Sequence, residues 1–152
     1  MAGKHRMYIG GEWIEGSAYF DDFDPATEKV IARFPIGSAK DVDKAVGAAY
    51  DALPAWSETP APARAHILLR VAGILKTEKQ RLGRLVATEM GKVMPEALGD
   101  VQEAIDTFEY FAGEGRRLFG HTTTSELKNK FCMTIRRPVG VMGLITPWNF
   151  PI

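Results

Sequence analysis

The stretch that decides the fold stands at the carboxyl end and reads Val139-Gly140-Val141-Met142-Gly143-Leu144-Ile145-Thr146-Pro147-Trp148-Asn149-Phe150-Pro151-Ile152. Its apolar run, residues 141–145, has the length of a buried strand. The run passes into Thr-Pro-Trp-Asn-Phe-Pro, where the prolines keep the backbone extended and stiff. Because ligands of open α/β sheets bind beyond the carboxyl ends of the strands, this turn is expected to present Trp148 and Asn149 to a bound molecule.

Asn149 has the chemistry of a hydrogen-bond donor to a developing negative charge. Its side-chain amide donates without carrying a charge itself, which suits the stabilisation of an oxyanion in a dry pocket. On spacing alone, the same residues also fit a proline-rich turn with a packed aromatic side chain. Both interpretations remain open at the level of the motif.

The composition is that of an ordinary globular protein. Of 152 residues, 45% are hydrophobic and 25% charged, and 19 Lys and Arg balance 19 Asp and Glu. This balance argues against binding to nucleic acid or to an anionic membrane surface. No apolar run approaches the ~20 residues of a membrane span, and the first residues are not followed by a signal-peptide core, so a cytoplasmic location is expected.

The amino-terminal region has β patterns. Residues 7–9 and 12–14 flank Gly10-Gly11, a pair able to adopt the positive φ angles of a tight hairpin. Asp24-Pro25-Ala26-Thr27 has the chemistry of a turn, and residues 30–34 follow it as a further strand. Together these segments predict a small antiparallel unit.

Helical patterns follow. Ser38 and Asp41 form a plausible capping pair for a helix that Pro54 is expected to end. A second helix is predicted to begin near Pro62, because proline is tolerated in a first turn, and to break near residues 76–77.

A third apolar stripe stops at Gly91, which suits the left-handed residue after a helix. Pro95 opens a long fourth helix that is expected to reach about Leu118. Residues 131–136 alternate as a half-exposed strand does, and Pro138 ends that strand. The pattern thus predicts four helices between two β regions.

The motif Leu144-Ile145-Thr146-Pro147-Trp148-Asn149-Phe150-Pro151 closely resembles the Pro-Trp-Asn-Phe-Pro motif of the NAD(P)-dependent aldehyde dehydrogenase superfamily. The resemblance extends over most of the chain, through Tyr8-Ile9-Gly10-Gly11-Glu12-Trp13, Asp24-Pro25-Ala26-Thr27 and Glu89-Met90-Gly91-Lys92. Ser125-Glu126 and residues 113–120 resemble the branch that handles semialdehydes. The chains of this family are several-fold longer than the present sequence.

The resemblance implies an α/β fold, namely the amino-terminal part of the aldehyde dehydrogenase fold. Its parts would be an antiparallel β hairpin, four helices, one oligomerisation strand and the first strand of a Rossmann-like cofactor domain. Residues 1–152 would form a partial cofactor-binding domain, with the oligomerisation strand at about residues 129–138 and the catalytic domain absent.

The resemblance also implies a function, the oxidation of an aldehyde or semialdehyde to the carboxylic acid with NAD or NADP. Asn149 would help form the oxyanion hole, and the cofactor would be contacted by Ile145, Thr146, Pro147 and Trp148. The family's catalytic cysteine and glutamate lie far downstream of this motif, so the chain alone is expected to be inactive. A homo-oligomer is expected when the protein is full length.

Other candidate sites favour structural interpretations. Cys132, the single thiol, lies in the middle of a predicted strand and behaves as a small hydrophobe. The glycines of residues 113–118 follow a helix instead of a strand, so they are not a phosphate loop. Glu89 and Lys92 bracket a helix end, where solvated charges are common. By resemblance, Asp100 matches a position linked to a monovalent cation in some members, but one carboxylate does not predict a metal site.

Two other functions remain open on the sequence. The chain is either a non-catalytic truncated product that pairs with full-length subunits through residues 131–137, or an unrelated helical binding module with flanking strands. The coding sequence beyond Ile152 distinguishes a fragment of an enzyme from a truncated product.

Overall fold

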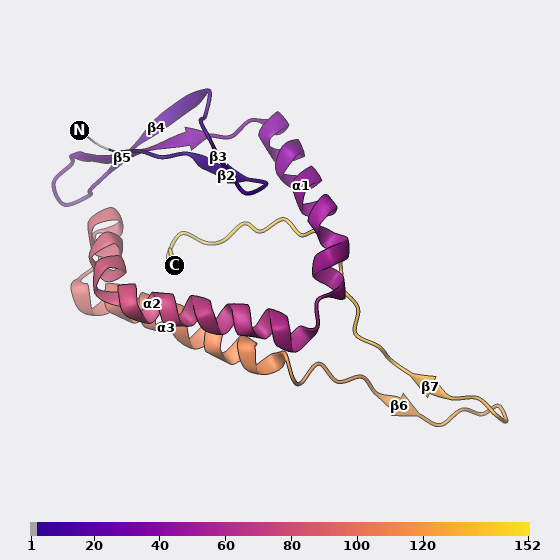
Figure 1. The fold of residues 1–152 in the computed structure, drawn as a ribbon. Helices are drawn as coiled ribbons and strands as arrows, with labels where there is room; N and C mark the ends of the chain where they lie inside the picture. Colours follow the sequence, from indigo (N-terminus) through magenta and orange to yellow (C-terminus); the bar gives the residue numbers. More distant parts are fainter. Residues whose placement is uncertain (1–2) are drawn as a thin grey trace.

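A computed structural model describes residues 3–152 of the chain. Figure 1 shows a β-rich amino-terminal part, followed by α1 (Ala39–Glu58) and by two long helices that lie side by side, α2 (Ala61–Met90) and α3 (Met94–Glu114). A β arm, formed by β6 (Thr122–Thr123) and β7 (Cys132–Met133), projects from the body, and the last residues then return toward it. Within residues 3–152, no helix is both long enough and apolar enough to cross a bilayer.

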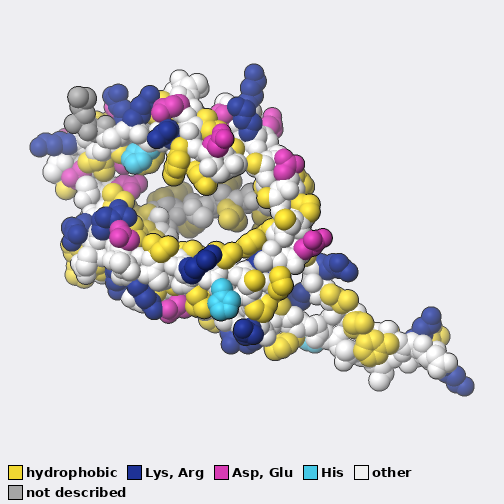
Figure 2. Space-filling model, in the orientation of Figure 1, with side chains coloured by type: hydrophobic (Ala, Val, Ile, Leu, Met, Phe, Trp, Pro, Cys, Tyr) yellow, Lys and Arg dark blue, Asp and Glu magenta, His cyan; other side chains and the backbone are white. Residues whose placement is uncertain are grey.

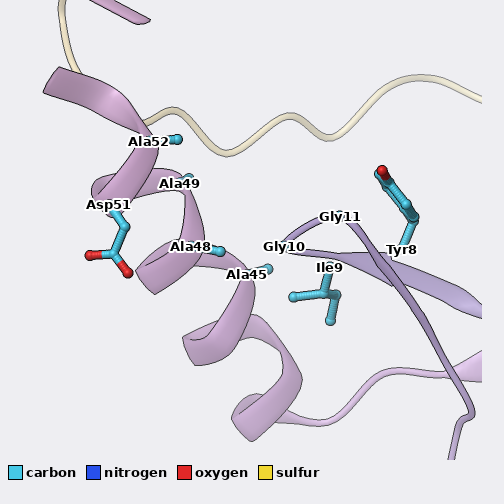
Figure 3. Close-up of a pocket in the computed structure, with 9 residues that line it drawn as sticks. All are labelled: Tyr8, Ile9, Gly10, Gly11, Ala45, Ala48, Ala49, Asp51 and Ala52. Atoms are coloured by element: carbon cyan, nitrogen blue, oxygen red, sulfur yellow. The ribbon is translucent and has the colours of Figure 1, made fainter. Parts of the chain in front are cut away.

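The predicted hairpin is confirmed. Strands β2 (Met7–Ile9) and β3 (Glu12–Ile14) pair antiparallel, with Tyr8 opposite Trp13. Gly10 and Gly11 connect them with φ angles of 62° and 89°, values that side chains disfavour and glycine tolerates. The hairpin tip faces α1 across a groove of ≈ 620 Å³ (Figure 3).

A second small sheet has the strand order β1-β5-β4, with β1 (Gly3–Lys4) parallel to β5 (Val30–Ile36) and β4 (Ala18–Phe23) antiparallel to it. The sequence predicted β5 but missed β4, because Asp21 and Asp22 interrupt its apolar character. An edge strand tolerates such residues, since their side chains reach water or an exposed partner. Asp21 pairs with Arg33 of β5 at 2.7 Å.

The predicted turn at Asp24 is confirmed by its hydrogen bonds. Its carboxylate accepts from the backbone N–H of Ala26 at 2.8 Å and from the hydroxyl of Thr27 at 2.9 Å. These donors, that of Ala26 first, lower the pKa of Asp24 below its ordinary value.

Helix α1 begins with the predicted capping box. The Asp41 carboxylate accepts from the Ser38 backbone N–H at 2.8 Å, and the Asp41 N–H donates to the Ser38 hydroxyl at 3.3 Å. The prediction that Pro54 ends this helix is wrong, since α1 continues to Glu58. Proline leaves one carbonyl of the preceding turn without its helical partner, but no residue of α1 is buried, so water is available to that carbonyl.

The predicted break near residues 76–77 is also wrong, and α2 is one helix of 30 residues. The chain therefore has three helices in its described part instead of the four that were predicted. Packing on α3 explains the continuity, because tertiary contacts along a whole face override weak local preferences. Lys76 forms an ion pair with Glu109 of α3, and Gly83 lets α3 approach so closely that a Cβ there would lie 2.6 Å from Leu98 Cδ2.

The end of α2 and the start of α3 lie where the sequence predicted them, whereas the end of α3 does not. Gly91 ends α2 in the left-handed conformation with φ 73°, as predicted. Pro95 lies in the first turn of α3, also as predicted, but this helix ends at Glu114 and not near Leu118. Gly113 and Gly115 lower the helical preference there, and the Gly115 N–H turns back to the carbonyl of Ala112.

The core lies mainly between α2 and α3. Its most completely buried side chains are Ile105 and Val101 of α3, and alanines allow the two helices to approach each other. The buried apolar residues of this interface are Ala65, Ala72, Val86, Ala97, Val101, Ala104, Ile105 and Ala112. Figure 2 shows a hollow beside this core that hydrophobic side chains frame on the visible face.

The predicted strand at residues 131–136 is shorter in the structure, where only Cys132 and Met133 pair with Thr123 and Thr122. Beyond this pair, the N–H of Thr134 donates to the carbonyl of His121 at 2.8 Å. Alternation predicted the strand correctly, but its length depends on the partner strand that the arm supplies.

Candidate functional site

Residues 139–152 form neither helix nor strand, and the chain turns at Trp148 and Asn149 and bends at Phe150. The predicted buried strand at residues 141–145 is therefore wrong for this chain. Leu144 is 80% exposed and Ile145 fully exposed, so no neighbouring strand of the described residues covers them. A strand needs hydrogen-bonding neighbours, and an apolar run alone does not supply them.

The segment is hydrogen-bonded to Lys92, which lies between α2 and α3. Its ammonium donates to the backbone carbonyl of Asn149 at 2.7 Å and to the Asp100 carboxylate at 2.6 Å. The side chain of Lys92 is 21% exposed and that of Asp100 is 9% exposed. The three residues thus join the terminal segment to the helical body through a largely shielded ion pair.

Phe150 adds an apolar contact beside this ion pair. The Lys92 ammonium lies 5.1 Å from the centre of the Phe150 ring, within the range of a cation–π contact. Phe150 and Ile152 also line a groove of ≈ 210 Å³ together with α3 residues that include Ala104 and Phe108. The residues that follow Asn149 are therefore held against α3.

The sequence predicted Asn149 and Ile145, Thr146, Pro147 and Trp148 as site residues. The structure places them consecutively on the terminal segment, where Trp148 and Asn149 form a turn, with Trp148 88% exposed and Ile145 fully exposed. Asn149 is the member of this group that Lys92 holds, through its backbone carbonyl, which leaves its side-chain amide available as a donor.

Lys92 and Asp100 were missed as parts of this site. Lys92 was interpreted as a charge at a helix end, yet its ammonium reaches a residue 57 positions along the chain. Asp100 is the buried charged residue of the described region, and Lys92 is its partner. The sequence did contain a signal for this pair, because Asp100 stands among the apolar positions of α3. A carboxylate that is buried there requires a counter-charge nearby.

Cys132 lies on the β arm, half-buried in β7. Figure 1 places this arm outside the body, whereas the terminal segment returns to it. This location agrees with a structural role for Cys132. No group of three or more His, Cys, Asp or Glu side chains among residues 3–152 is arranged to hold a metal ion.

The terminal segment has the chemistry to contact one end of a nicotinamide cofactor. The exposed indole of Trp148 and the flanking apolar residues offer contacts to a planar ring and its ribose.

A further groove, of ≈ 380 Å³, lies between the amino-terminal sheet and α2 and includes His5, Asp22 and Glu89. Partial desolvation raises the pKa of Glu89 above its ordinary value, and the nearby charge of Asp22 adds a smaller shift in the same direction. The nearby His5 opposes both. The groove of Figure 3 is different, because alanines and glycines line most of it and the Asp51 carboxylate points away from the hairpin.

A family model described as "Aldehyde dehydrogenase family" matches residues 13–152, including the segment that Lys92 holds. The chain belongs to the aldehyde dehydrogenase family. This match agrees with the resemblance in the terminal motif.

Relatives of this aldehyde dehydrogenase chain include semialdehyde dehydrogenases. It is 40% identical over 149 residues to the malonate-semialdehyde dehydrogenase of Bacillus pumilus, covering 97% of this chain and 31% of that protein. The chain thus spans about a third of the length of the curated relatives it matches.

Solved structures show the same fold. An NADP-dependent enzyme of Escherichia coli superposes with a TM-score of 0.94 at 35% identity, over 97% of this chain and 31% of that one. The succinate-semialdehyde dehydrogenase of Burkholderia pseudomallei gives 0.93 at 38% identity, with the same coverage. The fold is therefore the amino-terminal part of the aldehyde dehydrogenase fold, with three helices among residues 3–152.

Proposed function

We propose that residues 1–152 form the amino-terminal part of an enzyme that oxidises an aldehyde or semialdehyde to the carboxylic acid with NAD or NADP. In this proposal they make up a partial cofactor-binding domain, with an oligomerisation strand at about residues 129–138, and the catalytic domain lies outside them. The observation that carries the proposal is the match of the family to a segment in which Lys92 holds Asn149 in place.

Asn149 would stabilise the negative charge that forms on the aldehyde oxygen. When a cysteine thiolate from outside these residues adds to the carbonyl carbon, the carbonyl electron pair moves to the oxygen. The Asn149 side-chain amide, together with a backbone N–H, would donate hydrogen bonds to that oxygen. An amide fits this role because it donates without adding a charge that would also attract the thiolate.

The segment before Asn149 would contact the nicotinamide end of the cofactor through Ile145, Thr146, Pro147 and Trp148. When bound, the cofactor supplies the acceptor of the hydride. The exposure of Ile145 and Trp148 supports this assignment, because both side chains are available to a bound molecule. The choice between NAD and NADP depends on residues near the adenosine ribose, outside this chain's contribution.

A semialdehyde is the proposed substrate class. The support comes from the relatives, whose names include malonate-semialdehyde and succinate-semialdehyde dehydrogenase. A carboxylate at the far end of such substrates would require a cationic partner, which this proposal assigns to the catalytic part of the enzyme. The cytoplasmic location and the homo-oligomer expected from the sequence remain predictions of the same proposal.

A second candidate is a non-catalytic truncated product that pairs with full-length subunits through residues 129–138. The β arm favours it, because β7 pairs with β6 on one side, and Phe131 and Ile135, which flank β7, are exposed. An exposed strand edge of this kind is a template for pairing with another chain.

The test is an assay of the longest polypeptide that the coding sequence specifies. It should form reduced nicotinamide with malonate or succinate semialdehyde, and faster than with an uncharged aldehyde of the same length. If the reading frame ends at Ile152 and the chain co-purifies with a full-length enzyme, the second candidate replaces the first.

A further inference from the structure

The structure assigns Lys92 a role in positioning Asn149, with Asp100 fixing the direction of the Lys92 side chain. This inference rests on the proposed function, since Asn149 matters for catalysis only if the segment serves an aldehyde dehydrogenase. Lys92 itself touches neither the aldehyde nor the cofactor in this proposal. It acts through the backbone of Asn149.

The hydrogen bonds of Lys92 are of the strong kind. The ammonium donates to Asp100 at 2.6 Å and to the Asn149 carbonyl at 2.7 Å, and an ionised donor makes a hydrogen bond stronger than a neutral one does. Because Lys92 is 21% exposed and Asp100 only 9% exposed, water competes weakly for either group. Removing the ammonium would leave the Asp100 carboxylate buried without a counter-charge.

The helical body gives Lys92 a rigid base. Gly91, in its left-handed conformation, ends α2, and Val93 is the residue that precedes α3. Since these two helices form the best-packed part of the molecule, the backbone at Lys92 cannot shift without moving them.

The terminal segment, by contrast, has little structure of its own. Residues 139–149 lie outside any helix or strand, and Ile145 and Trp148 are exposed. Holding the Asn149 carbonyl restrains the peptide plane between Asn149 and Phe150. Pro151 in turn restricts the backbone angles of Phe150, the residue that precedes it. Because the Asn149 side chain starts from a Cα in that peptide plane, the contact restrains the position from which the side chain extends.

Catalysis is sensitive to such an arrangement. An oxyanion donor must lie within hydrogen-bond distance of an oxygen that carries charge only in the transition state. A misplacement of about 1 Å costs roughly a hundred-fold in rate. Loss of the Lys92 contact should therefore lower kcat and leave the KM for the aldehyde and for the cofactor nearly unchanged.

The experiment is a double-mutant cycle in the full-length enzyme that carries this segment. Lys92→Met, Asn149→Ala and the double variant are compared by steady-state kinetics, with Lys76→Met as the matched control. Lys76 also joins α2 to α3 through an ion pair, with Glu109, but it lies on the exposed side of both helices. Lys92→Met should lower kcat about 10- to 100-fold in the wild-type background and by less than about two-fold in the Asn149→Ala background.

A purely structural role for Lys92 would give the same loss of kcat in both backgrounds, and that result would overturn the inference. Unchanged kcat in Lys92→Met would do the same. If instead Asn149→Ala keeps the wild-type kcat, the oxyanion assignment fails, so the two failures are distinguishable.

Lys92→Arg covers the case in which Lys92→Met does not fold. Arginine keeps the charge that Asp100 requires, but its larger planar head cannot occupy the same point between the two acceptors. We expect a smaller loss of kcat than in Lys92→Met, which again disappears when Asn149 is alanine. An equal loss in both backgrounds counts against the inference here as well.

Discussion

Gly91 and Pro25 are in contact, although each belongs to a different local motif. Gly91 ends α2 with φ 73°, and a Cβ added there would lie 2.9 Å from Cγ of Pro25. The turn at Asp24 and the end of α2 therefore meet in space, one residue before Lys92. Any side chain at position 91 would disturb both motifs.

Gly91→Ala should destabilise the protein. The left-handed conformation alone costs a non-glycine residue about 1–2 kcal/mol, and the contact with the Pro25 ring adds to this cost. Gly99→Ala is the control, because Gly99 lies inside α3 with nothing within 4 Å of an added Cβ. That change should stabilise by about 0.5–1 kcal/mol through helix preference. Thermal unfolding of the full-length protein measures both, and equal shifts in Tm would contradict the prediction.

Asn149→Ala should lower kcat of the full-length enzyme with little change in its fold. Removing one oxyanion donor typically costs roughly a hundred- to a thousand-fold in rate, or about 3–4 kcal/mol. Asn149→Asp should be worse, because a carboxylate repels both the oxyanion and the thiolate. Steady-state kinetics, with circular dichroism to monitor folding, tests this. If chemistry is rate-limiting, a wild-type kcat for Asn149→Ala means that the motif is only a turn.

Trp148→Ala should affect cofactor binding more than the chemical step. The indole is 88% exposed in this segment and is proposed to contact the nicotinamide end. We expect the KM for NAD or NADP to rise, with a smaller change in kcat. Trp56→Ala on α1 is a suitable control, since the Arg64 guanidinium lies 5.9 Å from the centre of that indole ring and Trp56 is not among the residues proposed to contact the cofactor. A similar rise in KM for both variants would refute the assignment.

Residues 1–152 alone should not oxidise aldehydes. The chain carries the proposed oxyanion donor, but its single cysteine, Cys132, lies on the β arm. The purified chain should form no reduced nicotinamide with a panel of aldehydes and semialdehydes. Turnover that Cys132→Ser abolishes would overturn both the fragment interpretation and the structural role of Cys132.

Glu89→Gln should increase stability at neutral pH and have less effect in acid. Because partial desolvation of its carboxyl group and the nearby Asp22 raise the pKa of Glu89 in the folded state, folding favours the protonated form. The contribution of Glu89 is therefore most favourable below the pKa of an unfolded glutamate, about 4.3, and is lost as the pH rises through the raised folded value. Tm measured from pH 4 to 8, with exposed Glu12→Gln as control, tests the sign. A gain that is constant across this range would contradict it.

Local chemistry predicted much of the fold. The hairpin at Gly10-Gly11, the capping box at Ser38 and the helix end at Gly91 all appear as expected, because each depends on the φ angles or hydrogen bonds of a few adjacent residues. The terminal motif was sufficient to suggest the family that the comparison then showed. Two of the misassignments, at Pro54 and in the middle of α2, are places where packing or solvation outweighs local preference.

The sequence by itself determined which segment is the candidate for the site, namely the motif around Asn149, and the residue types available there. Only the tertiary structure decided what holds that motif, since Lys92 and Asn149 lie 57 positions apart and no local pattern links them. The physical reason is that a buried carboxylate, Asp100, needs a counter-charge wherever the fold can supply one. Lys92 supplies it from the loop between two packed helices, and its remaining hydrogen bond reaches the backbone of Asn149.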